Sequence, residues 1–398
     1  MSPRTLLEAV SARGRGHVPA DNCGSQLDIP ALNALALRAL VLLFEEKEKL
    51  FSRRVTLTDD GFHREGTSRK RTIIALLGLQ RLAESGEAPP VDVASIRDVV
   101  LGDTRWVRSV GDLGLLTWFT AECVPERLGI LLNELDFGKG LDTYSDGRQA
   151  CTRGLAWFLA GIAHARLACP RTLPDLTDVV VDAYHLLQDN QSEGRIFGHA
   201  TFPRFLQHTF CSRFGTFADQ IYAIYALTTC ARAFQIEEPL ESALGCANAV
   251  RALQGELGQW WFLYDKHACR VVNRYPVFSL HQDGLAPVGL LALGEATGQS
   301  FHESISKGLS WIAGANELGD DLRNQDGGLI WDSIAPRRRI ANYWEAALNF
   351  ISISRGPRVE SLRIRYEARP DHFGWLLYAF GRFGLPKAEI VAEADTTH

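Results

Sequence analysis

The sequence predicts an all-α fold, an (α/α)6-type toroid in which about six helical hairpins close into a ring. Three observations support this prediction. Apolar residues recur at helical spacing over most of the 398 residues, segments with strand character are few, and similar short segments recur along the chain. With 46% hydrophobic and 22% charged residues the chain can bury a large core, so we expect one domain over residues 1–398.

The helical periodicity is clearest at residues 155–162 and 217–227, where large apolar side chains repeat every three or four positions. Ser68 stands where it can cap a helix that starts with the basic triplet Arg69-Lys70-Arg71. Together these patterns predict about a dozen helices. Further helices are expected at residues 30–50, 69–85, 112–135, 175–189, 240–254, 284–297, 302–315, 341–353 and 371–383.

Three short segments have the pattern of extended chain. Residues 54–58 lead into Asp60-Gly61, a hairpin-type turn signal, and residues 268–278 and 362–366 alternate or are β-branched. They are too few to build a sheet core. We therefore expect small ribbons on loops at one rim of a helical body.

Two kinds of segment recur. Small residues combine with Trp at 154–161, 308–314 and 373–378, a pattern typical of helices that pack closely in concentric rings. Gln-rich turns begin at Gln191, Gln254 and Gln325, about 63 and 71 residues apart, a spacing that suits one or two helical hairpins. A closed stack of hairpins is the expected result.

The composition argues against several kinds of partner. A formal net charge of -5 gives no general reason to bind nucleic acid. We expect no transmembrane segment, because the most apolar stretch, residues 34–44, is short and interrupted by Arg38. The N-terminus lacks a secretory pattern, and the eight cysteines are scattered singly, so we expect a cytoplasmic protein with reduced thiols.

The turn at Gln254, Gly258 and Trp260 resembles the QW motif, Gln-x-x-x-Gly-x-Trp, of the squalene and terpenoid cyclase superfamily. The α/α toroids of that superfamily include protein prenyltransferase subunits. The resemblance implies that the Gln amide caps a helix end and that the Trp ring stacks beside it. The copies at Gln191 and Gln325 fit only approximately.

The sequence also departs from that superfamily. The Asp-x-Asp-Asp motif of class II cyclases is missing, and Asp320-Asp321-Leu-Arg-Asn does not supply the class I metal motif. The expected ring of paired helices equally resembles six-hairpin glycosidases, sugar epimerases and polysaccharide lyases. These enzymes carry Asp, Glu, His, Tyr and Arg in a central cleft, and fold alone does not separate the two groups.

The densest group of candidate site residues lies between Gly258 and Gly284, just before a predicted helix. Asp283 is the candidate general acid, with His281 setting its protonation state, because an aromatic cavity raises a carboxyl pKa. The alternative is that Asp283 only caps the helix. Nearby rings and an amide could bind a carbocation or a sugar, although core packing is an equal alternative for them; the residues are Trp260, Trp261, Tyr264, Tyr275, Phe278 and Gln282.

Two further clusters supply candidates. Asp219 and Tyr222 lie within one helical turn, so both can face a common cavity, although Asp219 could instead cap its helix. Glu367, Arg369 and His372 precede another helix and could bind an anionic group, or form a solvated loop. The remaining acid or base candidate is Glu317, and Tyr275 is an auxiliary proton carrier.

A metal site is not expected. Asp265, His267 and Cys269 alternate and are acceptable zinc ligand types, but they lie within five residues and enclose Lys266. We therefore predict no metal ligands and no cofactor.

These observations lead to two functional hypotheses. The first, which rests on the QW-like turn, is a terpenoid-cyclase-like lyase or isomerase that protonates and cyclises an isoprenoid. The alternative is a carbohydrate-active enzyme (glycoside hydrolase, polysaccharide lyase or sugar epimerase) that acts on an oligosaccharide with Asp283 and a partner from Asp219, Glu317 or Glu367. A cavity walled by aromatic and aliphatic side chains would indicate the first, and a cleft open at one end with several convergent carboxylates would indicate the second.

Overall fold

A computed structural model describes residues 28–145, 151–170, 176–199, 212–337 and 361–386. The described part is mainly helical, with short antiparallel strands, so the all-α toroid prediction is confirmed. The predicted helix at 341–353 lies outside the described residues. The helices are α2 (Ile29–Leu43), α3 (Arg69–Ala83), α4 (Val93–Leu101), α5 (Val110–Cys123), η1 (Pro125–Arg127), α6 (Leu128–Glu134), α7 (Phe137–Ser145), α8 (Thr152–Ala168), α9 (Thr177–Gln188), α11 (Phe217–Phe234), α12 (Glu238–Ala252), η2 (His281–Leu285), α13 (Ala286–Thr297), α14 (His302–Ile312), α16 (Pro370–Phe380) and η4 (Gly381–Phe383).

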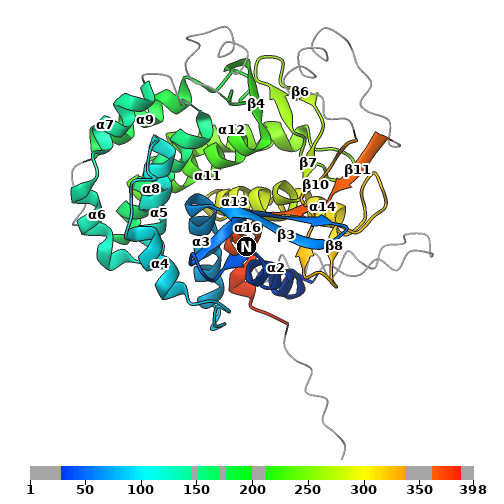
Figure 1. Cartoon of the computed structure of the whole chain (residues 1–398). Helices are drawn as coiled ribbons and strands as arrows, with labels where there is room; N and C mark the ends of the chain where they lie inside the picture. Colours follow the sequence, from blue (N-terminus) through cyan, green and yellow to red (C-terminus); the bar gives the residue numbers. More distant parts are fainter. Residues whose placement is uncertain (1–27, 146–150, 171–175, 200–211, 338–360, 387–398) are drawn as a thin grey trace, which may run out of the picture.

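In the described part of the chain, six helices form a closed inner ring. Helix α3 packs on α5, α5 on α8, α8 on α11, α11 on α13, α13 on α16, and α16 returns to α3. The other helices cover this ring from outside: α2 lies on α16, α4 on α3, α6 and α7 on α5, α9 on α8, α12 on α11, and α14 on η2 and α13. Figure 1 shows α6, α7 and α9 at the outer margin with α5 and α8 inside them.

The inner helices begin with side-chain caps. Ser68 accepts a hydrogen bond from the N–H of Arg71 at the start of α3, as predicted, and Ser109 does the same for Asp112 in α5. In α11, Thr216 and Asp219 form a reciprocal capping box. Thr216 is thus the cap residue, and Asp219 takes part in the cap from the first turn of the helix.

The inner helices approach one another at glycines. Gly374 of α16 lies against the backbone of α3 at Ile74 and Ala75, and Gly161 of α8 lies against the backbone of α5 at Gly114. A Cβ at either position would overlap these backbone atoms. The small residues seen in the repeated sequence segments thus allow the helices to pack in contact.

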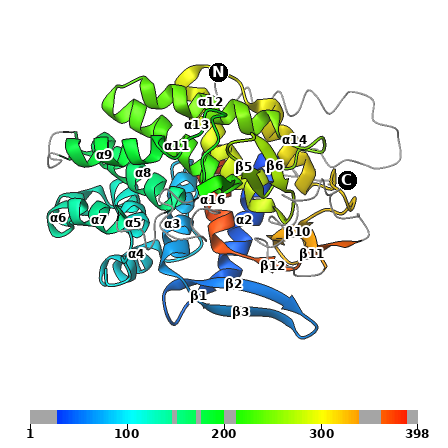
Figure 2. The same cartoon turned by 90° about the horizontal axis from the view of Figure 1, so that it is seen from above.

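The strands lie on loops between the helices, and the three ribbons predicted from the sequence are present. Strand β2 pairs with β3, β1 and β12; β10 pairs with β7 and β11; β5 pairs with β4 and β6; and β8 pairs with β9. Figure 2 shows the β2–β3 hairpin standing out from the helical body. The strands are β1 (Phe44–Glu45), β2 (Leu50–Thr58), β3 (Gly61–Thr67), β4 (Phe214–Thr216), β5 (Leu263–Asp265), β6 (Arg270–Asn273), β7 (Val277–Phe278), β8 (Arg323–Asn324), β9 (Leu329–Ile330), β10 (Ser333–Pro336), β11 (Leu362–Arg365) and β12 (Glu367–Ala368).

Aromatic side chains fill the middle of the inner ring. The Trp118 ring stacks on His164 and Tyr225, each at 4.9 Å between ring centroids, and lies 5.4 Å from Trp375. Tyr222 continues the cluster at 5.8 Å from Trp375. Trp118 and Trp375 are fully buried, so this layer separates the two ends of the ring.

Two simpler predictions concern membranes and thiols. Among the described helices, none combines the length and the apolar character that crossing a membrane requires. The six cysteines in the described part of the chain are free thiols.

Candidate functional site

All six inner helices run in the same direction, so the ring has two different ends. The first turns of α3 and α5 are joined by Lys70 and Asp112, and their last turns by Arg81 and Glu122. A cavity of about 390 Å³ lies at the end where the inner helices begin, and a second one of about 80 Å³ lies where they end. Helix N-termini carry partial positive charge, so the larger cavity favours anions.

Charged and aromatic side chains line the larger cavity. Its wall contains four cationic side chains and one carboxylate, and the rings of Trp157, Tyr222, Phe262 and Phe278 form much of its apolar surface. The charged residues are Lys70, Arg71, Arg153, Arg369 and Asp371.

Three of these four cations have a carboxylate partner. Lys70 Nζ lies 2.5 Å from Asp112 Oδ1, and Arg369 Nε donates to Asp332 Oδ1 at 2.8 Å. Arg153 differs, because it forms no ion pair with a carboxylate of the described residues, and its guanidinium lies 5.4 Å from the Trp157 ring. Arg153 is therefore the cation that is most free to bind an anionic group in the cavity.

Two titratable groups of the wall can exchange protons with a bound molecule. Asp371 Oδ1 lies 3.4 Å from Arg71 Nε and accepts no hydrogen bond from the described residues. Burial, helped by the charge of Arg369, lowers the pKa of His281 to about 3, so its ring is neutral at neutral pH. His281 Nδ1 is buried and has no hydrogen-bond partner in the described structure.

Asp283 and Asp219 lie behind the wall, each paired with a histidine. His372 Nε2 lies 2.7 and 2.9 Å from the two carboxylate oxygens of Asp283, and burial raises the pKa of this fully buried acid. Asp219 contacts His199 Nδ1 at 3.0 Å. Burial alone would raise the pKa of Asp219, but His199 and the Thr216 cap lower it below its usual value.

Asp283 does not cap the helix as an N-terminal residue. It lies within a π-helical turn, η2, that leads directly into α13 and also carries His281. Such turns widen a helix locally and are frequent at functional sites. Asp283 is therefore not a simple helix cap, as the alternative from the sequence had it, but the partner of His372.

The structure brings together only part of the predicted site. Tyr222, Phe278, His281 and Arg369 line the cavity, whereas Asp219, Asp283 and His372 support it from behind. The remaining predicted residues do not line it. Trp260, Tyr264 and Gln282 are buried in the core, and Trp261 packs against Tyr275. Tyr275 OH donates to Glu317 Oε1 at 2.7 Å, and Glu367 pairs with Arg54.

The chain segment considered for zinc forms a turn between β5 and β6. Asp265 pairs with Arg213 and accepts the backbone N–H of His267 at 3.0 Å, and Cys269 Sγ lies 3.5 Å from Gly194 O. Within the described ranges, no three potential ligand side chains converge on one point.

Sequence reasoning did not assign Arg153, Trp157 or Asp371 to the site. Each lies in the first two turns of an inner helix. The alternation of inner and outer helices is the signal that identifies such positions, because it puts the start of every second helix at the same end of the ring.

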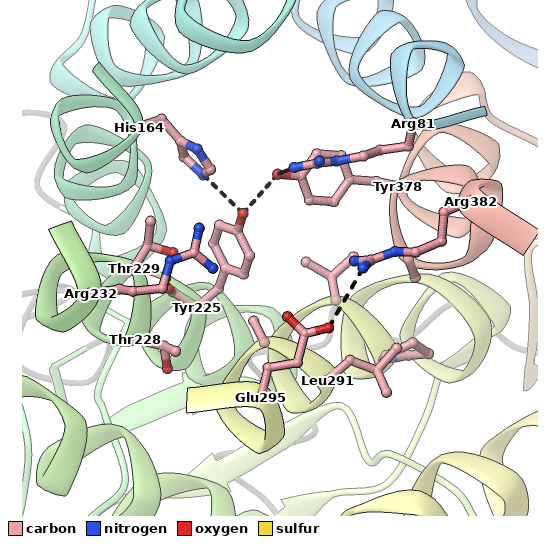
Figure 3. A pocket seen from close by; sticks show the side chains of 14 residues that line it. Arg81, His164, Tyr225, Thr228, Thr229, Arg232, Leu291, Glu295, Tyr378 and Arg382 are labelled. Carbon is pink, nitrogen blue, oxygen red and sulfur yellow. Dashed lines mark hydrogen bonds and ion pairs between the residues drawn. The ribbon is translucent and has the colours of Figure 1, made fainter. Parts of the chain in front are cut away.

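The smaller cavity, shown in Figure 3, has a floor of hydrogen-bonded side chains. Tyr225 OH lies 2.9 Å from His164 Nε2 and 2.8 Å from Tyr378 OH, which donates to Glu122 Oε1 at 2.6 Å. Glu122 Oε1 also lies 2.9 Å from His164 Nδ1 and 3.1 Å from Arg81 Nη2. Because these groups already bind one another, we place the candidate site in the larger cavity.

The Glu122 network leads to a stability prediction. Burial alone would raise the pKa of Glu122, but His164 and Arg81 lower it from 4.5 to about 2. Glu122→Gln is expected to lower the free energy of unfolding by about 2 kcal/mol at pH 7, because Arg81 loses its carboxylate partner and the hydrogen-bonded network around residue 122 is disrupted. A carboxylate with a lowered pKa stabilises above its unfolded value, so the difference from the unmodified protein shrinks as the pH falls from 4.5 towards 2.

Denaturant titrations over this pH range measure the effect. The control is Glu303→Gln, which removes an exposed pair with Lys307 and is expected to change stability by less than about 0.5 kcal/mol. Equal effects of the two variants at pH 7 would contradict the proposed importance of the Glu122 network.

Comparison with known proteins gives a fold but no family. No family model and no curated protein matches the chain. A sugar epimerase from a ruminal bacterium is 8% identical, with a TM-score of 0.57 over 96% of this chain and 100% of its own. An unsaturated glucuronyl hydrolase specific for heparin is 12% identical, with a TM-score of 0.55 over 96% of this chain and 97% of its own.

A third solved structure is a variant of the unsaturated glucuronyl hydrolase from Streptococcus agalactiae in complex with dGlcA-GalNAc6S. It is 12% identical, with a TM-score of 0.57, and the match covers 92% of this chain and 93% of that chain. The resemblance to glycosidase-like toroids is thus confirmed for the fold.

The terpenoid-cyclase prediction is wrong. The three solved structures compared above are carbohydrate-active enzymes, and the cavity wall carries four cationic side chains where an isoprenoid pocket would be walled by apolar groups. The QW-like turn gave a misleading signal. Gln254 Nε2 donates to Gly258 O at 2.9 Å and Ser304 O at 3.0 Å, so the Gln joins the turn to α14, and the comparisons do not support a cyclase relationship.

Proposed function

We propose that the chain is a carbohydrate-active enzyme that binds an acidic saccharide, one carrying carboxylate or sulfate groups, in the larger cavity. The single observation that supports this most is the wall of that cavity, where four cations and several aromatic rings meet at the N-terminal ends of the inner helices. Aromatic rings stack on sugar rings, and arginine binds carboxylate and sulfate with paired hydrogen bonds.

The reaction proposed is a proton transfer at the bound sugar. Asp371 and His281 are its acid and base candidates, because both line the cavity and each has an oxygen or nitrogen atom without a hydrogen-bond partner in the described structure. Asp283 is buried and paired with His372, so we assign it a positioning role in the turn that carries His281. The chain is then an enzyme of the hydrolase, lyase or epimerase type.

Two of the proteins with a similar fold have names that fit an acidic substrate. The names of both glucuronyl hydrolases refer to uronic acid saccharides, and one names heparin. At 12% identity this likeness supports the proposal only together with the charged cavity of this chain.

The direct test is incubation with uronate-containing, sulfated and neutral oligosaccharides, followed by mass spectrometry and ultraviolet absorbance. Hydrolysis adds one water to the products, a lyase creates a conjugated double bond, and an epimerase leaves the mass unchanged. Turnover of neutral saccharides alone would contradict the proposal.

Arg153 provides a prediction that separates acidic from neutral ligands. Arg153→Gln is expected to weaken the binding of an acidic saccharide about tenfold, since one charge-assisted contact of about 1.4 kcal/mol is lost, and to leave a neutral counterpart unaffected. Isothermal titration calorimetry at two salt concentrations measures it. Arg127→Gln, on the outer helices with its side chain 52% exposed, is the control; an equal effect of both variants would exclude Arg153 from the site.

A further inference from the structure

A second basic depression, which we call the arginine cleft, lies between α4 and α5. It is more open to solvent than the larger cavity, which is the larger of the two cavities within the ring; it measures about 500 Å³ and is lined by Arg69, Asp103, Arg105, Trp106 and Arg108. Arg69 starts α3, and the other four residues belong to the connection into α5. The cleft therefore opens at the same end of the ring as the larger cavity.

Positive charge is in excess in the arginine cleft. Its only lining carboxylate, Asp103, pairs with Arg105 Nε at 2.8 Å and with Arg69 Nη2 at 3.2 Å. Arg105 lowers the pKa of Asp103 to about 2, so this acid stays ionised. Three arginines against one carboxylate leave two positive charges uncompensated within the lining.

Hydrogen-bond donors are also in excess. Arg69 Nε and Trp106 Nε1 are buried and have no acceptor in the described residues. Unmatched donors of this kind favour an oxygen-rich ligand that brings acceptors and negative charge together.

The arginine cleft and the larger cavity are linked through neighbouring residues. Lys70, which lines the cavity, follows Arg69 directly and pairs with Asp112. The other oxygen of Asp112, Oδ2, accepts the backbone N–H of Arg108 at 3.1 Å. A chain of sugars that leaves the cavity past Lys70 therefore meets Arg69 and Arg108 next.

We propose that the arginine cleft is a second anion-binding subsite and that the substrate is an acidic oligosaccharide with negative groups on at least two of its sugar units. This inference rests on the proposed function. It adds that one acidic unit occupies the larger cavity while a carboxylate or sulfate of a neighbouring unit binds the three arginines, with Trp106 as an apolar surface for its ring.

The test compares a uronate monosaccharide, the matching diuronate and triuronate, and a neutral trisaccharide by isothermal titration calorimetry. The unmodified protein is expected to bind the longer acidic ligands at least about tenfold more tightly than the monosaccharide. The double variant Arg105→Gln, Arg108→Gln is expected to lose this gain and to keep its affinity for the monosaccharide. The Arg108 side chain is exposed, and its contact with Asp112 uses the backbone, so the variant keeps that link.

The outcomes separate the two proposals. Monosaccharide binding that depends on Arg153, without any gain from chain length, overturns the second subsite and leaves the proposed function standing. An equal loss of affinity for short and long ligands in the double variant also overturns the subsite. The subsite is likewise overturned if inorganic sulfate binds at the cleft but does not compete with the triuronate. If no acidic saccharide binds in any variant, the proposed function fails, and the subsite fails with it.

Discussion

Replacement of Asp371 by Asn is expected to lower kcat for the proposed saccharide reaction by about a hundred- to ten-thousand-fold, with a small change in KM. General acid–base groups contribute rate factors of this size, and Asn keeps the shape of the side chain but cannot carry the proton. The carboxylate lies on the cavity wall beside Arg71, at the start of α16. Steady-state kinetics on the acidic saccharide identified by the screen measures the effect.

The control for this variant is Asp326→Asn, an exposed acid in the turn between β8 and β9, which is expected to keep full activity. Thermal unfolding of both variants establishes that the fold is intact. Activity of Asp371→Asn within about threefold of the unmodified enzyme would remove Asp371 from the reaction, because no general acid–base role has so small an effect. His281→Gln would then be the next variant to examine, since His281 is the other titratable group of the wall that lacks a partner in the described structure.

Gly374→Val is expected to lower the free energy of unfolding by about 3 kcal/mol or more, the largest stability effect that we predict. The new side chain would overlap the backbone of α3 at Ile74 and Ala75, and backbone atoms cannot move aside as a flexible side chain can. The strain lies at the contact between the first and the last inner helix, so relief would require the ring to open. Denaturant unfolding followed by circular dichroism measures the change.

Gly129→Val is the matched control. Gly129 lies in the outer helix α6, and a Cβ placed there meets no atom within 4 Å. Gly and Val have similar low helix propensities, so this change is expected to stay within about 0.5 kcal/mol. If the two valine variants unfolded at the same denaturant concentration, close packing against α3 would not be the reason that position 374 requires glycine.

The helices were predictable because their signals are local. Ser68 caps α3 as expected, and the apolar spacing placed α12 and α13 within about two residues of their observed bounds. Helix ends were less certain where tertiary contacts decide them. Helix α2 stops at Leu43 because Phe44 pairs with β2, and the single helix expected at 112–135 is broken before Pro125, whose ring cannot continue a helix.

The site was only partly predictable because most of its residues come from five separate helix starts. His281, Arg369 and Tyr222 were identified from their clusters, since each has polar or aromatic neighbours in sequence. Arg153 stands in a segment of mostly small and apolar residues, and its place in the cavity depends on which helices form the inner ring. Trp260 shows the opposite error, because an aromatic-rich segment beside His and Asp is here a core segment that stacks on Phe217.

The way in which the ring closes has a consequence for the order of folding. Helices α3 and α16 are neighbours in space, yet nearly 300 residues separate Gly78 from its contact at Gly374. During synthesis the earlier hairpins can stack as they emerge from the ribosome, but the aromatic centre near Trp118 stays open on one side until Trp375 has been made. A nascent chain that stalls before residue 370 is thus expected to expose apolar surface and to depend on chaperones, whereas release of the full chain buries that surface in one late step.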